Sequence, residues 1–189
     1  VDQPDIEITP LQTNPAVPGD RDIPRVVIEI DLAHRGPQSS RRHGNEILTS
    51  DVRVRRFITI HLRRVKIHGA FVLGHYVALA VMWGKDLANN PVFVDAVDFG
   101  LDPIQQQTLD SFHDDHPGCL PGVPAALNRK RIVAPAAATL QIEYGEIVYQ
   151  VWNRTLVPPS LHVVPVPVPP NLVLDLRQME MMSLTAWNP

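Results

Sequence analysis

Proline is the feature of this sequence that most restricts the fold. Nineteen of the 189 residues are proline, about twice the average frequency, and they are spread along the whole chain. Because proline fixes φ and removes a backbone hydrogen-bond donor, frequent prolines divide a chain into short segments. Short strands joined by turns are therefore favoured over long helices. The sequence predicts a mainly-β fold.

Alternating apolar and polar side chains predict where those strands lie. Residues 25–32 (RVVIEIDL) alternate in this way, which is the pattern of a half-buried strand. Residues 76–83 (YVALAVMW) are almost all apolar, as expected for a central strand buried on both faces. In the strand expected at residues 51–62 (DVRVRRFITIHL), the apolar side chains change from one alternate set of positions to the other, so we expect a bulge near Arg55 and Arg56. Further strands are expected at residues 64–73, 131–133, 139–144, 146–152, 172–176 and 183–187, with an edge strand or polyproline segment at 161–168.

The segments between these strands carry loop and helix signals. Residues 34–45 are polar and contain glycine, which predicts a loop. Asparagine and proline at 90–91 are a helix-start signal, so residues 92–100 fit a short helix as well as a strand. Aspartate and proline at 102–103 repeat that signal, and a short helix is predicted over 104–114.

These elements together predict one single jelly-roll β-sandwich of about eight strands, with one or two short helices inserted. Residues 1–24 contain five prolines and are expected to form an extended N-terminal arm. Residues 25–157 form the predicted sandwich core. Residues 158–189, rich in proline and valine, are expected to pack on their own subunit or on a neighbouring one.

Composition and charge narrow the classes of function. The net charge of −3 gives no global attraction to nucleic acid or to anionic membranes. No apolar run approaches the roughly 20 residues that span a bilayer, so we expect no membrane partner. Cys119 is the only cysteine, which excludes an intrachain disulfide, and it has no basic neighbour that would lower its pKa.

The basic residues are clustered although the whole chain is slightly acidic. If their strands alternate, Arg53 and Arg55 share one face, and Arg64 and Lys66 share one too. Such strands would present a cationic surface to phosphates, which predicts nucleic-acid binding. The alternatives are a solvated outer face, or ion pairs with acids of a neighbouring subunit. The predicted nucleic-acid-binding residues are Arg53, Arg55, Arg56, Arg63, Arg64, Lys66, Arg129, Lys130 and Arg131, with Arg41 and Arg42 in the same basic set.

The order of segments from residue 49 to residue 133 resembles a known family. A basic strand leads into V-K-I-H-G (residues 65–69), an apolar strand ends in a polar turn, and P-V-F-V-D-A-V follows at 91–97. The basic segment N-R-K-R-I-V at 128–133, which leads into the next predicted strand, follows. This order is similar to that of the small single-jelly-roll coat proteins of plant satellite viruses and geminivirus-like viruses. The resemblance implies a capsid protein of the virion, which assembles with itself, and with other coat subunits, into an icosahedral shell around nucleic acid. It also implies a short helical excursion over 91–97.

Candidates for metal binding and catalysis are weak. His113, Asp114, Asp115 and His116 form the densest group of metal-ligand residue types. A site there would need a distant fourth ligand, and the cupin spacing of histidines and glutamate is missing. A polar helix end explains this run better, so we expect no metal, the alternative being Ca²⁺ at subunit contacts through Asp114 and Asp115. The distant ligands considered for such a site are His61, His68, His75 and His162.

No nucleophile elbow, phosphate-binding loop or dinucleotide fingerprint occurs, so we expect no catalytic residue, no cofactor and no enzyme activity. An apolar stripe interrupted by prolines marks a contact surface instead, because it cannot pair fully as a strand. The predicted subunit interface consists of Val163, Val164, Val166, Val168 and Trp187. Two other functions remain open: a β-sandwich binding module of a larger virion or cell-surface assembly, and a metal-dependent enzyme on a double-stranded β-helix.

Overall fold

A computed structural model of the chain confirms the mainly-β class. It describes residues 5–9, 24–31, 37–51, 53–86, 88–102, 138–143, 146, 151–152, 155–156 and 170–178. Strands make up 59% of these residues. The predicted helix at 104–114, the predicted strands at 131–133, 161–168 and 183–187, and Cys119 lie outside this part of the chain.

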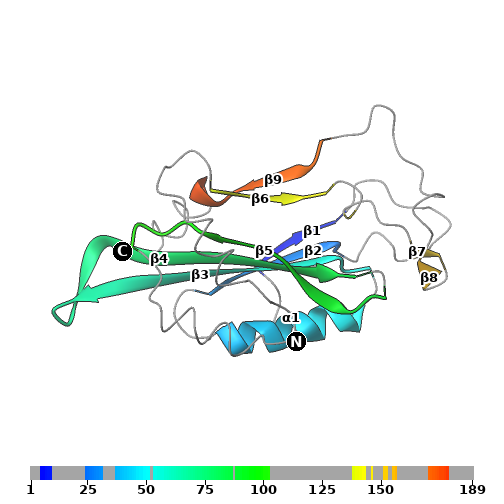
Figure 1. Cartoon of the computed structure of the whole chain (residues 1–189), viewed down its shortest axis with the longest axis horizontal. Helices are drawn as coiled ribbons and strands as arrows, with labels where there is room; N and C mark the ends of the chain where they lie inside the picture. The colour runs from blue at the N-terminus through cyan, green and yellow to red at the C-terminus, as the bar shows by residue number, and fades with distance from the viewer. Residues whose placement is uncertain are drawn as a thin grey trace.

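The centre of the fold is a five-stranded sheet with the order β1-β2-β3-β4-β5 (Figure 1). Its strands are β1 (Ile6–Ile8), β2 (Val26–Asp31), β3 (Arg56–Ile67), β4 (Ala70–Lys85) and β5 (Pro91–Asp98). Strands β2 and β3 pair in parallel, whereas the other neighbours are antiparallel. A parallel pair needs a crossover connection, and here the connection contains helix α1 (Pro37–Ser50).

Both faces of this sheet are covered, as Figure 1 shows. Helix α1 lies on one face. The antiparallel pair β6 (Thr139–Ile142) and β9 (Leu172–Asp175) lies on the other. A small antiparallel ribbon is formed by β7 (Val151–Trp152) and β8 (Thr155–Leu156). The two faces bury separate apolar clusters, so the sheet stands between two hydrophobic layers.

The prediction of a central strand at 76–83 is confirmed, because β4 contributes to both clusters. Ala78, Ala80 and Met82 point toward the β6–β9 layer. The intervening residues Leu79, Val81 and Trp83 point toward α1. Successive side chains of a strand face opposite sides of the sheet, so a strand buried on both faces has an apolar residue at nearly every position.

The predicted loop at 34–45 is wrong, because most of it belongs to α1. Tertiary packing stabilises this polar helix: Leu48 is buried against the sheet, and Ile47 packs beside it. Gly44 lets the helix approach closely, since a Cβ atom there would lie 2.5 Å from Cδ1 of Phe57. The Phe57 ring is completely buried under the helix. His43 also contacts the sheet, through Glu29 and the edge of the Phe57 ring. These few positions hold the helix, but they are too few to give a clear sequence pattern.

Three further predictions are corrected at β3, β4 and β5. The strand predicted over 51–62 begins only at Arg56, so the predicted bulge at Arg55 and Arg56 is wrong, and the register shifts instead between Arg64 and Lys66. The separate strand predicted at 64–73 is the turn of the β3–β4 hairpin and the strand ends beside it. Residues 91–98 form β5 rather than a helical excursion, because the pairing with β4 outweighs the local helix-start signal.

Strands from the two predicted terminal segments pair with strands of the predicted sandwich core. Within the predicted N-terminal arm, β1 pairs with β2 of the same chain, and the Ile30 amide donates to Oδ2 of Asp5 over 2.7 Å. Within the predicted C-terminal segment, β9 pairs with β6. Leu176, next to β9, is buried in the same cluster as Ile58. The described parts of both terminal segments therefore pack on their own chain.

Candidate nucleic-acid interface

Two of the predicted nucleic-acid-binding residues are buried and paired with one acid. Nε of Arg55 lies 2.9 Å from Oε2 of Glu146, and Nη2 of Arg56 lies 3.3 Å from Oε1 of the same carboxylate. Arg55 also donates to Oδ1 of Asn89 over 3.1 Å. Burial is the main cause that lowers the pKa of Arg56. This pair joins the beginning of β3 to a residue 91 positions away, so its role is structural.

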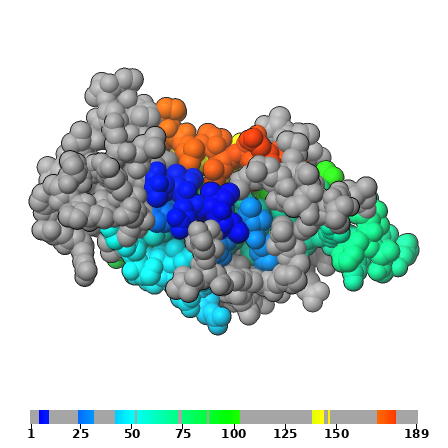
Figure 2. Space-filling model, turned by 180° about the vertical axis from the view of Figure 1, so that it is seen from behind, coloured from blue at the N-terminus to red at the C-terminus, as the bar shows by residue number. Residues whose placement is uncertain are grey.

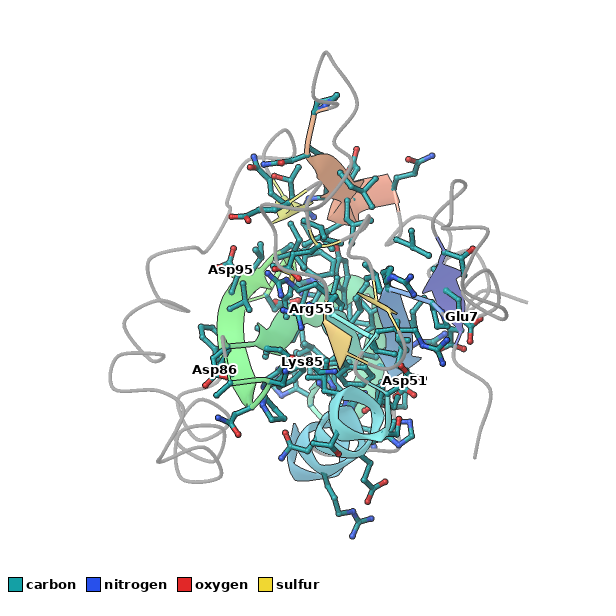
Figure 3. The ribbon with its side chains drawn as sticks, turned by 90° about the vertical axis from the view of Figure 1, so that its right-hand side faces the viewer. Glu7, Asp51, Arg55, Lys85, Asp86 and Asp95 are labelled. Atoms are coloured by element: carbon teal, nitrogen blue, oxygen red, sulfur yellow. The ribbon has the colours of Figure 1, made fainter. Side chains whose placement is uncertain are left out.

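A second charged group lies beside this pair, at the end of β4. Nε and Nη2 of Arg53 donate to the two carboxylate oxygens of Asp51 over 2.9 and 2.7 Å. Burial raises the pKa of Asp51, but the hydrogen bonds from Arg53 and the charges of Arg53 and Lys85 outweigh it and leave this pKa below its ordinary value. Nζ of Lys85 donates to the backbone oxygen of Asp51 over 2.7 Å. Burial, followed by the positive charge of Arg55, lowers the pKa of Lys85 to about 8. Figure 3 labels Lys85 together with Arg55 and Asp51.

Arg63 is held by an acid on the neighbouring strand. Its Nη2 lies 2.8 Å from Oδ2 of Asp31, and its Nη1 donates to the Asp31 backbone oxygen over 2.9 Å. Nδ1 of His61 lies 3.3 Å from the same Oδ2. Asp31 thus joins the end of β2 to β3 through two basic side chains.

The end of the β3–β4 hairpin differs from these three groups. We call residues 64–72 the β3–β4 arm; Arg64, Lys66 and every residue from Ile67 to Phe71 are exposed on it. The arm projects beyond the other described elements in Figure 1, and Figure 2 shows it from behind as a protrusion at one end. His68 (φ 50°) and Gly69 (φ 83°) form the two-residue turn, with the two positive φ angles of a type I′ hairpin.

The arm combines positive charge with exposed apolar side chains. Phe71 is 58% exposed and Ile67 is 39% exposed. Lys66 and Phe71 face each other across the two strands, and Nζ of Lys66 lies 4.8 Å from the ring centroid. The sequence contains no aspartate or glutamate between Asp51 and Asp86, so the whole hairpin is free of carboxylates. The arm is therefore an exposed surface with two cations and no acid of its own.

The structure therefore separates the basic residues that the sequence grouped together. The shared strand face predicted for Arg53 and Arg55 is wrong, because both residues precede β3. Four of these basic residues form ion pairs within their own chain: Arg53, Arg55, Arg56 and Arg63. Arg129, Lys130 and Arg131 lie outside the described residues, as does the side chain of Arg41, whereas Arg42 is exposed on α1.

The sequence reasoning missed Phe71 and Ile67. Two signals could have found them: the long stretch without acids, and the His68-Gly69 pair between two alternating segments, which is a hairpin signal. Residues 64–73 were instead treated as one strand, so the side chains around the turn were assigned to the wrong element.

The other predicted sites are only partly visible. His113, Asp114, Asp115, His116, His162 and the interface residues Val163, Val164, Val166, Val168 and Trp187 lie outside the described residues. His61 contacts Asp31, and Nδ1 of His75 lies 3.1 Å from Oδ1 of Asp102. His68 is in the β3–β4 turn, so the three histidines lie in different parts of the fold. Within the described ranges, no three His, Cys, Asp or Glu side chains are placed to hold a metal ion.

Comparisons with protein families, with curated protein sequences and with solved structures gave no match. Among the helical residues that the structure describes, no helix has the length and apolar character needed to cross a membrane. Among the described residues, the β3–β4 arm combines exposed cations with exposed apolar side chains.

Proposed function

We propose that this chain is a structural coat subunit that assembles with itself into a closed shell of the virion and encloses nucleic acid. The single observation that carries the proposal is the β3–β4 arm. It places Arg64 and Lys66 in solvent on a hairpin without carboxylates, although the chain as a whole has a net charge of −3. A locally cationic projection on a slightly acidic subunit suits contact with phosphates.

The sheet edges support assembly through arms rather than through strand pairing. Strand β5 begins with Pro91, and its pairing with β4 shifts register at Met82 and Trp83. Proline and bulges at an edge strand oppose the addition of another strand. Subunit contacts would then come from the proline-rich terminal segments, which lose little entropy on docking because they are already stiff.

The jelly-roll connectivity stays part of this proposal. The pairing of β6 with β9 over one face of the large sheet supports a two-layer sandwich. The parallel pairing of β2 with β3 and the helix between them differ from an all-antiparallel roll. We propose that the roll is modified at this point by the α1 crossover.

The test combines particle size with nucleic-acid content. Purified protein is examined by light scattering, negative-stain microscopy and the ratio of absorbance at 260 and 280 nm. We expect uniform closed particles that contain nucleic acid, and we expect their nucleic acid to be released at high salt because the contacts are ionic. A species with the mass of one chain at high concentration would overturn the coat proposal.

The charge of the arm is tested in the same particles. The double substitution Arg64→Glu and Lys66→Glu should reduce packaged nucleic acid severalfold while the subunits remain folded, because both side chains are exposed. The matched control is Arg42→Glu, which removes an exposed positive charge from α1. Equal nucleic-acid content in the two variants would contradict the role of the arm.

A further inference from the structure

We infer that the β3–β4 arm binds single-stranded nucleic acid, with Phe71 as a stacking surface for one base and with Arg64 and Lys66 as contacts to the adjacent phosphates. The inference rests on the proposed function and deepens it by naming the form of nucleic acid and the residue that recognises it.

The exposure of Phe71 is the first step. A side chain of this size normally buries most of its area, yet 58% of Phe71 is open to solvent at the tip of a projecting hairpin. Isolated apolar residues on a surface are common, but this ring occurs together with exposed Ile67 and two cations. The combination of an aromatic face and a cationic track is the arrangement that proteins use to bind unpaired bases.

The position of Lys66 is the second step. Its Nζ lies 4.8 Å from the centroid of the Phe71 ring, so the charge and the ring occupy one site rather than two. A base stacked on the ring would bring its own phosphate within reach of this ammonium group. Arg64 is exposed two residues earlier on the same strand, where it can meet a neighbouring phosphate of the same chain of nucleotides.

The exposed ring of Phe71 favours a single strand over a duplex. The described part of the arm exposes two cations, Arg64 and Lys66, beside this ring. Stacking on Phe71 requires a base whose face is accessible, which a single strand provides without the free energy needed to unstack a duplex.

The arm is anchored well enough to present these residues in a fixed arrangement. At its base, Arg64 of β3 lies opposite Tyr76 of β4 in the strand register, and the Tyr76 side chain is buried in the core. Next to this pair, Arg63 is bonded to Asp31 and His75 is bonded to Asp102. At its tip, the two-residue turn closes the hairpin. A preorganised arm loses less entropy when a flexible strand binds to it.

The experiment measures binding of the full chain, as unassembled subunits, to a fluorescent oligothymidine of 20 nucleotides and to a duplex of equal length. Fluorescence anisotropy should show tighter binding to the single strand. Phe71→Ala should weaken single-strand binding roughly 5- to 100-fold, the range reported by alanine substitution at stacking residues, and Phe71→Trp should restore it. Stacking should also quench the fluorescence that the new tryptophan adds to the wild-type signal.

Two further variants separate stacking from charge. The double variant with Arg64→Glu and Lys66→Glu should lower the dependence of log Kd on log salt by roughly 1.4, which is two contacts at about 0.7 each. Val94→Ala, at another exposed apolar residue, is the matched control and should bind like the wild type. Circular dichroism and thermal unfolding confirm that each variant remains folded.

The outcomes distinguish the inference from the proposed function. If Phe71→Ala binds like the wild type while the double variant loses binding, base stacking is wrong and the cationic contact to nucleic acid stands. Tighter binding to the duplex would overturn the choice of a single strand. If Phe71→Ala alters only particle assembly, the arm is a contact between subunits and the inference fails, although a coat protein is still supported. Particles that lack nucleic acid would overturn both.

Discussion

The Arg55 guanidinium is buried beside the Glu146 carboxylate, so the two charges depend on each other. Removing one partner of a buried pair leaves an uncompensated charge, which costs about 3–5 kcal/mol. We therefore expect Arg55→Met to lower the free energy of unfolding by about 3 kcal/mol in urea titrations. Arg64→Met, at an exposed arginine on the arm, should change it by less than about 0.5 kcal/mol. Equal effects of the two substitutions would contradict the division between structural and exposed arginines.

Lys85 makes stability depend on pH, because burial lowers its pKa to about 8. In the unfolded chain this lysine keeps its proton up to about pH 10.4, so between the two values the unfolded state binds more protons. The free energy of unfolding should therefore rise as the pH increases from about 8 to 10, by an amount on the order of 1–2 kcal/mol. In Lys85→Met this rise should disappear. The contributions of the other groups that titrate in this range cancel when the free energies of unfolding of the two proteins are subtracted at each pH. A parallel pH dependence in both proteins would contradict the assignment.

At the residue scale, the sequence could predict that basic side chains gather between Asp51 and Asp86, but not which of them reach solvent. Arg55 and Arg64 have similar local sequences. Their difference comes from Glu146, which is 91 residues from Arg55 in the chain and close to it only in the folded structure. The partner of Arg63, Asp31, is likewise 32 residues away. Ion pairs between residues so far apart in the chain cannot be predicted from the spacing of residues within a short segment.

At the element scale, the turn of the arm is the position where backbone conformation has the clearest consequence. Gly69 has φ 83°, and a Cβ atom there would meet nothing within 4 Å, so Gly69→Ala introduces backbone strain without a steric clash. We expect this substitution to destabilise the hairpin end by about 1–2 kcal/mol. His68→Asn should have the opposite effect, because asparagine tolerates positive φ better than histidine and Asn-Gly favours this turn type.

The measurement for this pair is amide hydrogen exchange in the arm. Because the hairpin end lies beyond the buried core, it can open without global unfolding, so the global urea midpoint should change little. Faster exchange in Gly69→Ala and slower exchange in His68→Asn are expected at residues 64–72. Unchanged exchange in both variants would show that the turn does not control the order of the arm.

The elements that could be predicted from the sequence are those whose own side chains show a clear apolar pattern. Residues 76–83 are almost all apolar and β2 alternates, so both strands were located, although β4 extends from Ala70 to Lys85. Helix α1 was missed because its few contacts with the sheet are made by His43, Gly44, Ile47 and Leu48 within a largely polar segment. Strand β5 was ambiguous because Asn90 and Pro91 favour a helix locally, and only the adjacent β4 decides between the two.

At the scale of the whole molecule, β1 tests whether the N-terminal segment stabilises its own chain or a neighbour. It pairs with β2, and the Arg25 amide donates to the backbone oxygen of Ile8 over 2.9 Å. Deletion of residues 1–9 removes these bonds and leaves β2 as an edge strand. Because each lost backbone bond contributes about 0.5–1.5 kcal/mol, the shortened chain should unfold at lower urea concentration.

Exposing the edge of β2 has a second consequence, which distinguishes a segment that stabilises its own chain from one that docks on a neighbouring subunit. An uncovered β2 can pair with other chains, so light scattering should detect irregular aggregates that grow with concentration. If the segment instead docks on a neighbouring subunit, the shortened chain should keep its urea midpoint and lose regular particles without aggregating. The observed pairing of β1 with β2 of the same chain favours the first result. If the destabilised chain still forms closed particles after refolding, the subunit contacts of the proposed shell lie outside residues 1–9.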